Sequence, residues 1–201
     1  MLLIDGELFP NSQSFFVNPN EKLSNILEGQ FRKDFFIGVC TIVLKLLNCV
    51  RPKFAIFGKK DFQQALIIQQ MCVQFNIFTE IILGDTVREN SGLAVSPRNG
   101  RLNSQELAES VHLYKIMRGA ADKILIISNV RALNREEIEK IEILALNELA
   151  DRGWRPEYFT IREKKSLNVP VLDKNQITDE LMILTAAWLG ENRLIDNLDI
   201  T

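Results

Sequence analysis

A strand–helix–strand pattern between residues 53 and 84 constrains the fold of this chain more than any other feature. Two short apolar runs, KFAIFG (53–58) and FTEIILG (78–84), flank a longer, mostly apolar run, DFQQALIIQQMCVQF (61–75). Short links around a helix are typical of a parallel βαβ unit, whose functional groups gather at the carboxyl ends of its strands. The stretch FGKKD (57–61) follows the first strand at such an end and is therefore the first candidate site.

Other runs in the first half of the chain predict further elements of this unit. The stretch FIGVCTIVLKLLNCV (36–50) carries a single charge, which predicts a helix buried on most of its surface. Upstream, KLSNILEG (22–29) predicts a short helix closed by Gly29. The apolar run at 53–58 predicts an interior strand of the sheet.

The character of the sequence changes near Thr86. Turn-forming residues dominate 87–103, and two helical runs follow, one over 104–117 that begins after Asn103 and one running from Asn134 to Gly153. Short strands are expected near 157–163, 182–190 and 192–198. Helices followed by short strands predict a small α+β domain, so the chain is divided into residues 1–86 and 87–201.

Charge and hydropathy exclude several function classes. A net charge of −2 gives no basis for binding nucleic acid or an anionic membrane. No apolar run is long enough to span a bilayer, and the first residues, MLLIDGELFPN, do not resemble an export signal. The three cysteines lie in apolar runs without metal-ligand spacing, which predicts buried free thiols and a cytoplasmic protein.

The chain contains a single histidine, His112. It falls in a predicted amphipathic helix without acidic or cysteine partners at metal-ligand spacing, which indicates a surface or packing role. Any mechanism that needs a pair of histidines cannot be supplied by this polypeptide alone.

The stretch FGKKDFQQ (57–64) admits two interpretations. Asp61 stands where a helix N-cap belongs, and Gln64 three residues later would complete a capping box. Lys59 and Lys60 precede a helix whose free backbone N–H groups favour an anion, and a lysine there suits a phosphate. Solvated lysines at a turn are the competing interpretation.

Two further groups of charged residues are candidates for a functional role. Three arginines and a serine in a Gly/Asn-rich turn could clamp a triphosphate, because arginine binds phosphate oxygens in bidentate fashion; the alternative is a polar surface loop. These residues are Arg88, Ser96, Arg98 and Arg101. In LEGQFR, Glu28 and Arg32 have the spacing of a local ion pair of small energetic worth.

Taken in order, these segments resemble the pantothenate synthetase (pantoate–β-alanine ligase) family. The resemblance rests on GxKDxQQ at 58–64, VRExxGLAxSxRN at 87–99 and RLIDN at 193–197, and it extends over essentially the whole chain. It implies a Rossmann-type, nucleotidyltransferase-like parallel sheet, here partial, with a smaller α+β C-terminal domain. Residues 1–86 would then bind the substrates, and residues 87–201 would cover the ATP.

The resemblance also implies an activity and a set of site residues. The family adenylates pantoate with ATP, and β-alanine then displaces AMP; members use magnesium and are typically homodimers. Carried over by position, Lys60, Ser96 and Arg98 would be catalytic, and Gln64 would bind pantoate. Glu28 and Arg32 would support the site. The nucleotide would be bound by Gly58, Lys60, Asp61, Val87, Ser96 and Arg98.

This chain departs from the family pattern in several places. The sequence is interpreted as lacking both the family's opening TMGALHxGH, whose two histidines hold phosphates, and its FVNPxQF segment, whose glutamine binds pantoate. Pro97 stands where the family usually has a second serine; it removes a hydroxyl and an N–H, and it favours extended geometry at Ser96. Lys33, Asp34 and Phe35 replace a PGH-like segment, and Lys59 replaces a glutamate.

Two hypotheses about function therefore stay open. The first is a pantothenate synthetase that acts only when a separate N-terminal fragment completes it. The second is a catalytically inactive relic or nucleotide-binding module of the same family. A reading frame upstream that encodes a TMGALHxGH-type segment would favour the first hypothesis.

Overall fold

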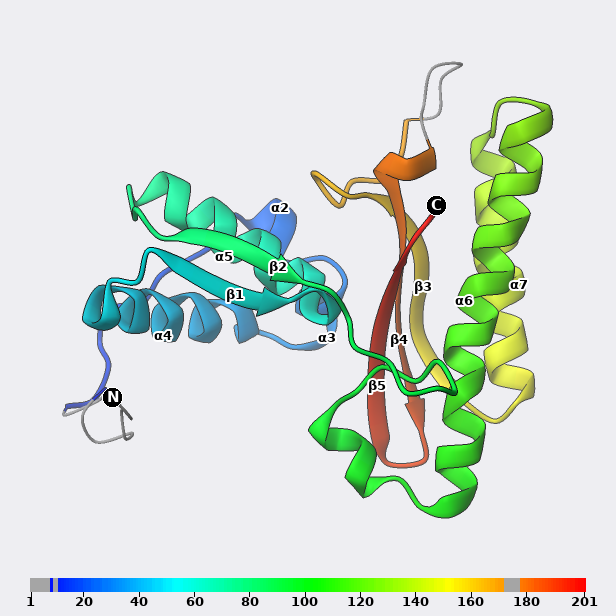
Figure 1. Ribbon diagram of the computed structural model, residues 1–201, viewed down its shortest axis with the longest axis horizontal. Helices are drawn as coiled ribbons and strands as arrows, with labels where there is room; N and C mark the ends of the chain where they lie inside the picture. Colours follow the sequence, from blue (N-terminus) through cyan, green and yellow to red (C-terminus); the bar gives the residue numbers. More distant parts are fainter. Residues whose placement is uncertain (1–7, 9–10, 172–177) are drawn as a thin grey trace. The chain divides into compact units, whose positions relative to one another are not determined.

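The computed structural model describes residues 8, 11–171 and 178–201, and it divides into two compact units (Figure 1). The first unit is Met1–Gly84 and the second is Asp85–Thr201. Each has its own secondary structure, so each is described separately. Among the described residues, no helix combines the length and hydropathy needed to cross a membrane.

The first unit contains the predicted βαβ motif. Strand β1 (Phe54–Gly58) is followed by a 3-10 turn, η1 (Lys59–Asp61), by helix α5 (Phe62–Gln74) and by strand β2 (Glu80–Gly84). The strands pair in parallel, with Phe54 opposite Glu80 and Gly58 opposite Gly84. The parallel βαβ prediction is confirmed, and the carboxyl ends of both strands meet at one edge.

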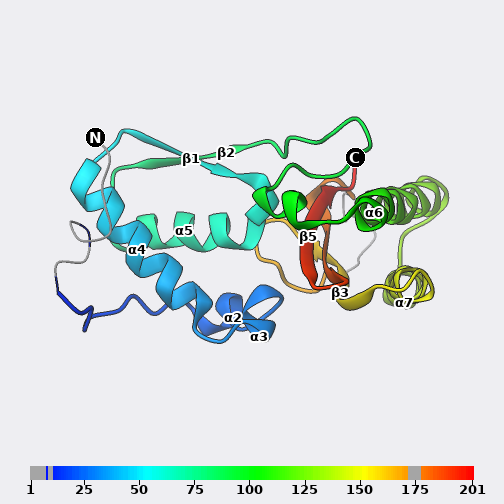
Figure 2. The same ribbon diagram turned by 90° about the horizontal axis from the view of Figure 1, so that it is seen from below.

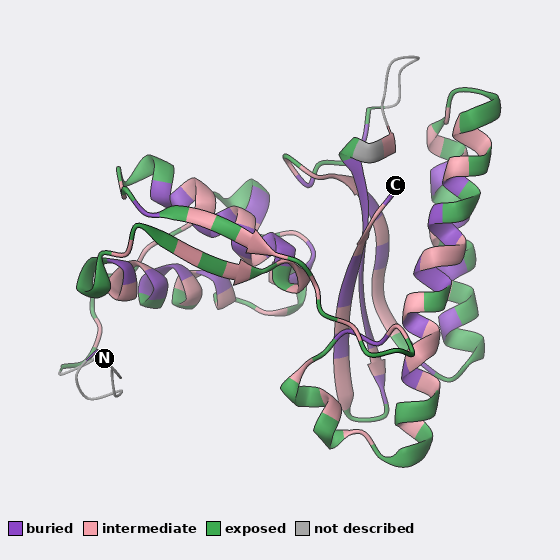
Figure 3. Ribbon diagram, in the orientation of Figure 1, coloured by how far each residue is buried: buried purple, intermediate pink, exposed green. Residues whose placement is uncertain are grey.

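Helix α4 (Phe35–Val50) and α5 lie on the same side of the β1–β2 pair (Figure 2). On alternate positions of the strands, Phe54, Ile56 and Ile82 are 47%, 75% and 39% exposed. Figure 3 shows that exposed and partly buried positions alternate along this pair of strands. The prediction of an interior strand was wrong for the part of the chain that the structure describes, because β1 pairs there only with β2.

Helix α4 also differs from the prediction in its burial. Its buried positions, Phe36, Cys40, Thr41, Val43 and Leu47, form one stripe, while Ile42 and Val50 are exposed. Spacings of three and four residues place the buried side chains on one face of the helix. The low charge of this run had predicted burial on most of the surface.

The expected helix at 22–29 is two short helices, α2 (Glu21–Ser24) and α3 (Glu28–Phe31). Leu27 lies between them with a positive φ of 50°. Gly29 does not close a helix: a Cβ at this position would lie 1.6 Å from the Ser24 carbonyl oxygen. The chain therefore bends here, and glycine is required by close backbone approach.

The second unit is an α+β layer of two helices on an antiparallel sheet. Helix α6 (Ser104–Val130) runs beyond the Met117 at which the sequence predicted its end, and α7 is Arg135–Asp151. Asn103 and Asn134 each form a capping box with the glutamate three residues later, as expected for helix starts. The sheet has the order β3-β4-β5, with β3 Arg155–Glu163, β4 Leu181–Leu189 and β5 Asn192–Asp199.

The core of this unit lies between the helices and the sheet. Fully buried side chains come from α6, α7, β3 and β4, and they include Met117, Ile124, Ile138, Ile161 and Ile183. The contacts join elements far apart in the sequence, so the sheet and the helix pair stabilise one another through apolar burial.

The three cysteines differ in exposure. Cys40 and Cys72 are buried, as predicted, whereas Cys49 is exposed, which corrects the expectation for that thiol. Burial raises the pKa of Cys40 to about 11 and raises the pKa of Cys72. Cys49 is therefore the thiol that a reagent in solution can reach.

We expect one thiol of three to react with a chromogenic disulfide reagent in the native chain at pH 8, and all three after unfolding in guanidinium, because the thiolate is the reacting species. Cys49→Ser should remove the native reaction. Rapid native reaction of two or more thiols would contradict this burial pattern.

Candidate functional site

The carboxyl end of β1 holds four of the predicted site residues. Gly58 ends the strand and is exposed, Lys60 lies half-buried in η1, Asp61 is exposed, and Gln64 is half-buried in the first turn of α5. The Asp61 side chain makes no capping hydrogen bond to α5. The predicted capping box is therefore not formed, and the first turn of α5 lies directly behind two lysines.

The neighbouring glutamine, Gln63, has a structural role. Its side chain is buried, its amide nitrogen donates to the carbonyls of Leu23 (2.7 Å) and Ile26 (2.8 Å), and its Oε1 accepts from the N–H of Glu28 (3.1 Å). These three bonds satisfy the backbone at the break between α2 and α3. The two glutamines of GxKDxQQ thus have different environments, which points to different tasks.

Glu28 and Arg32 form the ion pair that their spacing predicted, with 3.8 Å between Arg32 Nη1 and Glu28 Oε2. Glu28 is buried, and the Arg32 guanidinium lies 3.3 Å from the centre of the Phe35 ring. Both residues therefore stabilise the chain just before α4. A supporting role for Glu28 and Arg32 agrees with this position, and their ion pair contributes to that support.

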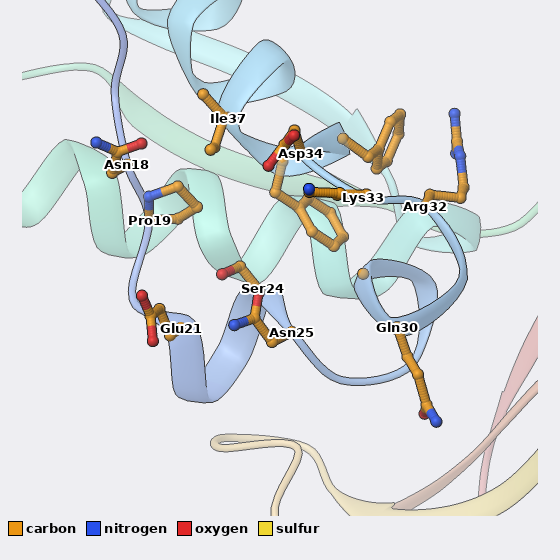
Figure 4. Close-up of a pocket in the computed structure, with 13 residues that line it drawn as sticks. Asn18, Pro19, Glu21, Ser24, Asn25, Gln30, Arg32, Lys33, Asp34 and Ile37 are labelled. Atoms are coloured by element: carbon orange, nitrogen blue, oxygen red, sulfur yellow. The ribbon is translucent and has the colours of Figure 1, made fainter.

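A cavity of about 540 Å³ lies beside this ion pair in the first unit (Figure 4). Its wall includes Arg32, Lys33 and Asp34, and the backbone at Asp34 is left-handed, with φ 58°. Of the predicted site residues, only Arg32 lines this cavity. The sequence also pointed to this region through Lys33, Asp34 and Phe35, which replace the family's PGH-like segment.

The opposite wall of this cavity contains part of a family segment that was expected to be missing. Asn18, Pro19 and Glu21 line the cavity, and they belong to the stretch FVNPNE (16–21). This stretch matches the first four positions of FVNPxQF, FVNP at 16–19. The conclusion that this segment is missing was therefore wrong in part, because its beginning is present; the glutamine of the motif does not follow it here.

The remaining predicted residues lie in the second unit, on the segment between β2 and α6. Val87 is 70% exposed. Ser96 is half-buried, and its hydroxyl accepts from the N–H of Arg98 (3.3 Å) at the start of a 3-10 turn, η2 (Pro97–Arg101). Ser96 has φ −153° and ψ 145°, so the extended geometry predicted from Pro97 is confirmed.

The three arginines of this segment are not equivalent. Arg88 donates to both carboxylate oxygens of Asp196 on β5, at 2.7 and 3.0 Å, and lies 4.2 Å from the Tyr114 ring centre. Its guanidinium also donates to the Gly92 and Asn197 carbonyls, both at 3.0 Å. Arg88 is thus bound by Asp196 and two carbonyls, so it is the arginine of the suggested clamp that is least available to a phosphate.

Arg98 and Arg101 differ from Arg88 in their exposure. Both are exposed, and Arg98 Nη1 makes a 3.3 Å bond to the Arg193 carbonyl of β5. A single long hydrogen bond to a carbonyl leaves most of a guanidinium's donors available. The segment therefore keeps Arg98 and Arg101 as arginines that could bind a phosphate, and Arg98 is the one that the family resemblance assigns to this role.

The predicted residues thus fall into two groups, one in each unit. The first unit places Gly58, Lys60, Asp61 and Gln64 on adjacent turns at the carboxyl end of β1. The second unit places Val87, Ser96 and Arg98 on one segment anchored to β5. Asp196 and Asn197 were not predicted as functional; their signal was the RLIDN motif in which they lie.

Comparison with known proteins identifies the family. The family model described as pantoate-beta-alanine ligase matches residues 5–199. The chain belongs to the pantoate-beta-alanine ligase family. The resemblance drawn from the motifs is therefore confirmed over nearly the full length of the sequence.

Solved structures of this family have the same fold. Pantothenate synthetase from Thermus thermophilus superposes with a TM-score of 0.83 at 26% identity, covering 97% of this chain and 67% of that protein. Pantoate-beta-alanine ligase from Francisella tularensis, complexed with beta-gamma ATP and beta-alanine, gives a TM-score of 0.72 at 28% identity. The match covers 98% of this chain and 62% of the Francisella protein, so this chain spans about two thirds of their length.

Substitution of the two adjacent glutamines tests whether Gln63 has the structural role and Gln64 does not. Gln63→Ala should lower the free energy of unfolding by about 1–3 kcal/mol, because it leaves buried backbone groups without partners. Gln64→Ala, the matched control one position away, should change it by less than about 0.5 kcal/mol. Urea unfolding followed by circular dichroism measures both. Equal losses from the two variants would contradict the assignment.

Proposed function

We propose that this chain is the ATP- and pantoate-binding part of a pantoate–β-alanine ligase. The observation that carries the proposal is the family match over residues 5–199, combined with GxKDxQQ at the carboxyl end of β1. Parallel sheets bind their ligands at that edge. In this proposal the substrates are pantoate, β-alanine and ATP; the complex of the Francisella relative with beta-gamma ATP and beta-alanine supports two of them.

The reaction proposed has two steps. A carboxylate oxygen of pantoate attacks the α-phosphorus of ATP, the bond to the β-phosphate breaks, and pyrophosphate leaves. The amine of β-alanine then attacks the acyl carbon of the adenylate, loses a proton and displaces AMP, which gives pantothenate. Positioning and charge stabilisation dominate such chemistry, and lysine, arginine and serine supply both.

Each predicted residue has a proposed task that fits its place. Lys60 binds a phosphate beside the first turn of α5, and Gln64, which shares that turn, donates to pantoate. Gly58 leaves room for the nucleotide to approach the backbone: a Cβ there would meet no atom within 4 Å. Asp61 contributes to the same nucleotide site.

The second unit supplies further residues that we assign to nucleotide binding. Val87 is exposed and apolar, as a contact to an adenine edge requires. Ser96 and Arg98 hold the triphosphate, with Arg98 exposed at the start of η2. The assignment of the two units as substrate-binding and ATP-covering domains, the homodimer and the cytoplasmic location belong to this proposal as well.

Magnesium fits the site as a companion of the nucleotide. No group of three or more His, Cys, Asp or Glu residues comes together among the described residues, so the ion would not have a protein cage there. Magnesium is commonly held by one or two carboxylates and the phosphates of the substrate, where it neutralises charge. Asp61, exposed beside Lys60, is a carboxylate that could assist.

We further propose that turnover needs a segment that carries the family's TMGALHxGH histidines, because this sequence contains one histidine. The alternative is a catalytically inactive relic that keeps nucleotide affinity. Pro97, which replaces a serine hydroxyl and an N–H in the phosphate-binding segment, is the observation that favours it.

The first measurement is pyrophosphate release by the purified chain with ATP, magnesium and pantoate, with and without an N-terminal fragment that carries TMGALHxGH. We expect release only when the fragment is present. Release by the chain alone would show that the histidines are dispensable, and silence under both conditions would favour the relic.

In whichever mixture is active, Lys60→Ala should lower release by at least about a hundredfold, because charge stabilisation at a transferring phosphoryl group is lost. Its unfolding free energy should change by less than about 0.5 kcal/mol. Lys53→Ala, at the opposite end of β1, is the matched control and should keep full activity. Undiminished release by Lys60→Ala would overturn the placement of the phosphate.

Pro97→Ser tests whether the proline weakens phosphate binding. The change restores a hydroxyl and an N–H, so we expect the Kd for Mg·ATP to fall by about tenfold, which corresponds to one or two hydrogen bonds to a charged group. Isothermal titration measures the Kd. Pro156→Ser, on β3, is the control; an unchanged affinity in Pro97→Ser would make the proline neutral.

A further inference from the structure

We infer that Arg88 and Asp196 are positioning residues that fix the geometry of the segment carrying Ser96 and Arg98. The inference rests on the proposed function, since it assigns nucleotide binding to that segment. It assigns the pair a task that neither the family match nor the motif pattern gives it. The contacts that support it all lie within the second unit.

Arg88 and Asp196 form a bidentate ion pair, which is called the Arg88–Asp196 joint below. Both terminal guanidinium nitrogens of Arg88 donate to the Asp196 carboxylate, and the two side chains are 18% and 4% exposed. A bidentate pair of this kind fixes orientation as well as distance. Asp196 Oδ1 also accepts from the N–H of Asn197 at 2.8 Å, which holds the carboxylate in place on β5.

Further bonds from Arg88 extend the joint into the segment itself. Arg88 Nη1 donates to the Gly92 carbonyl, four residues on, and Nη2 donates to the Asn197 carbonyl. The backbone around it closes into a tight turn: Glu89 N–H donates to Leu93 O, and Val95 N–H donates to Val87 O, both at 2.9 Å. The Arg88 side chain therefore links both sides of this turn to β5 by hydrogen bonds.

The Tyr114 ring packs against the same joint. The Arg88 guanidinium stacks on it, and Gly92 has φ 93° with a hypothetical Cβ only 2.3 Å from the ring. No other residue fits at Gly92 without moving Tyr114. The turn is thus held between a charge pair on one side and an aromatic ring from α6 on the other.

The turn leads directly into the residues proposed to bind phosphate. The Asn99 amide donates to the Ala94 carbonyl at 3.0 Å, and Arg98 donates to the Arg193 carbonyl of β5. Ala94 is itself paired with Arg88 in an isolated antiparallel bridge. The position of Arg98 is therefore set through Ala94, Arg88 and Asp196, and the motifs VRExxGLA and RLIDN act as one assembly.

Local hydrogen exchange tests the joint without any nucleotide. In Asp196→Asn, which removes the charge but keeps the side-chain shape, backbone amides of residues 87–99 should exchange at least about tenfold faster, because local opening becomes easier. Arg88→Lys should act in the same direction, since lysine cannot form the bidentate pair. Amides of β3 and β4 should keep the rates of the parent chain.

The matched control is Glu109→Gln. Glu109 pairs with Arg152 at 2.7 Å and accepts from Trp154 Nε1 at 3.1 Å; both partners lie in the same unit and outside residues 87–99. Its substitution should leave exchange in 87–99 unchanged. Parent-like exchange of 87–99 in both Asp196→Asn and Arg88→Lys would overturn the inference, and so would equal acceleration throughout the unit.

Titration with Mg·ATP separates this inference from the proposed function. Arg98→Ala should weaken binding if the segment holds the triphosphate, and Asp196→Asn should weaken it by about tenfold through misplacement of that arginine. Weakening by Arg98→Ala but not by Asp196→Asn would overturn the positioning role alone. If neither Arg98→Ala nor Ser96→Ala weakens binding, the proposed function fails, while the exchange rates still decide whether the joint exists.

Discussion

The parallel pairing of β1 with β2 is the constraint on which the first unit depends. Parallel neighbours cannot be joined by a tight turn, so the chain must leave β1 at its carboxyl end and return through a helix. That path places η1 and the first turn of α5 at the edge where β2 also ends. Lysines, an aspartate and a glutamine thereby share an edge with free helical N–H groups. This edge therefore gathers the groups of the first unit that we propose to bind the nucleotide and pantoate.

In the second unit, the corresponding constraint is the fixed conformation of the irregular segment between β2 and α6. Residues between β2 and α6 have no sheet or helix of their own apart from η2, so their backbone must be fixed by side chains. Arg88 does this by satisfying both oxygens of Asp196 and two carbonyls at once. A buried charge is tolerated only when it is paired and hydrogen-bonded in this way. The cost of burying Arg88 is therefore offset locally, and Arg98 is left exposed.

The chain belongs to the pantoate-beta-alanine ligase family and spans about two thirds of the length of its solved relatives. Within the described residues, β1 has one sheet neighbour, and Phe54 and Ile56 are exposed on the uncovered face. Exposed apolar side chains on a short parallel pair are unusual for a free-standing unit.

The sequence by itself determined the local elements of this protein. Apolar periodicity located α4, α5 and the strands, and the cap residues Asn103 and Asn134 placed the starts of α6 and α7, because these signals act over a few residues. Motif order determined the family. The tertiary structure decided what each polar residue of a motif does: Gln63 rather than Gln64 ties the backbone, and Arg88 rather than Arg98 is bound by an acid 108 residues away. Those partners are distant in the sequence, and no local pattern encodes a distance that only folding creates.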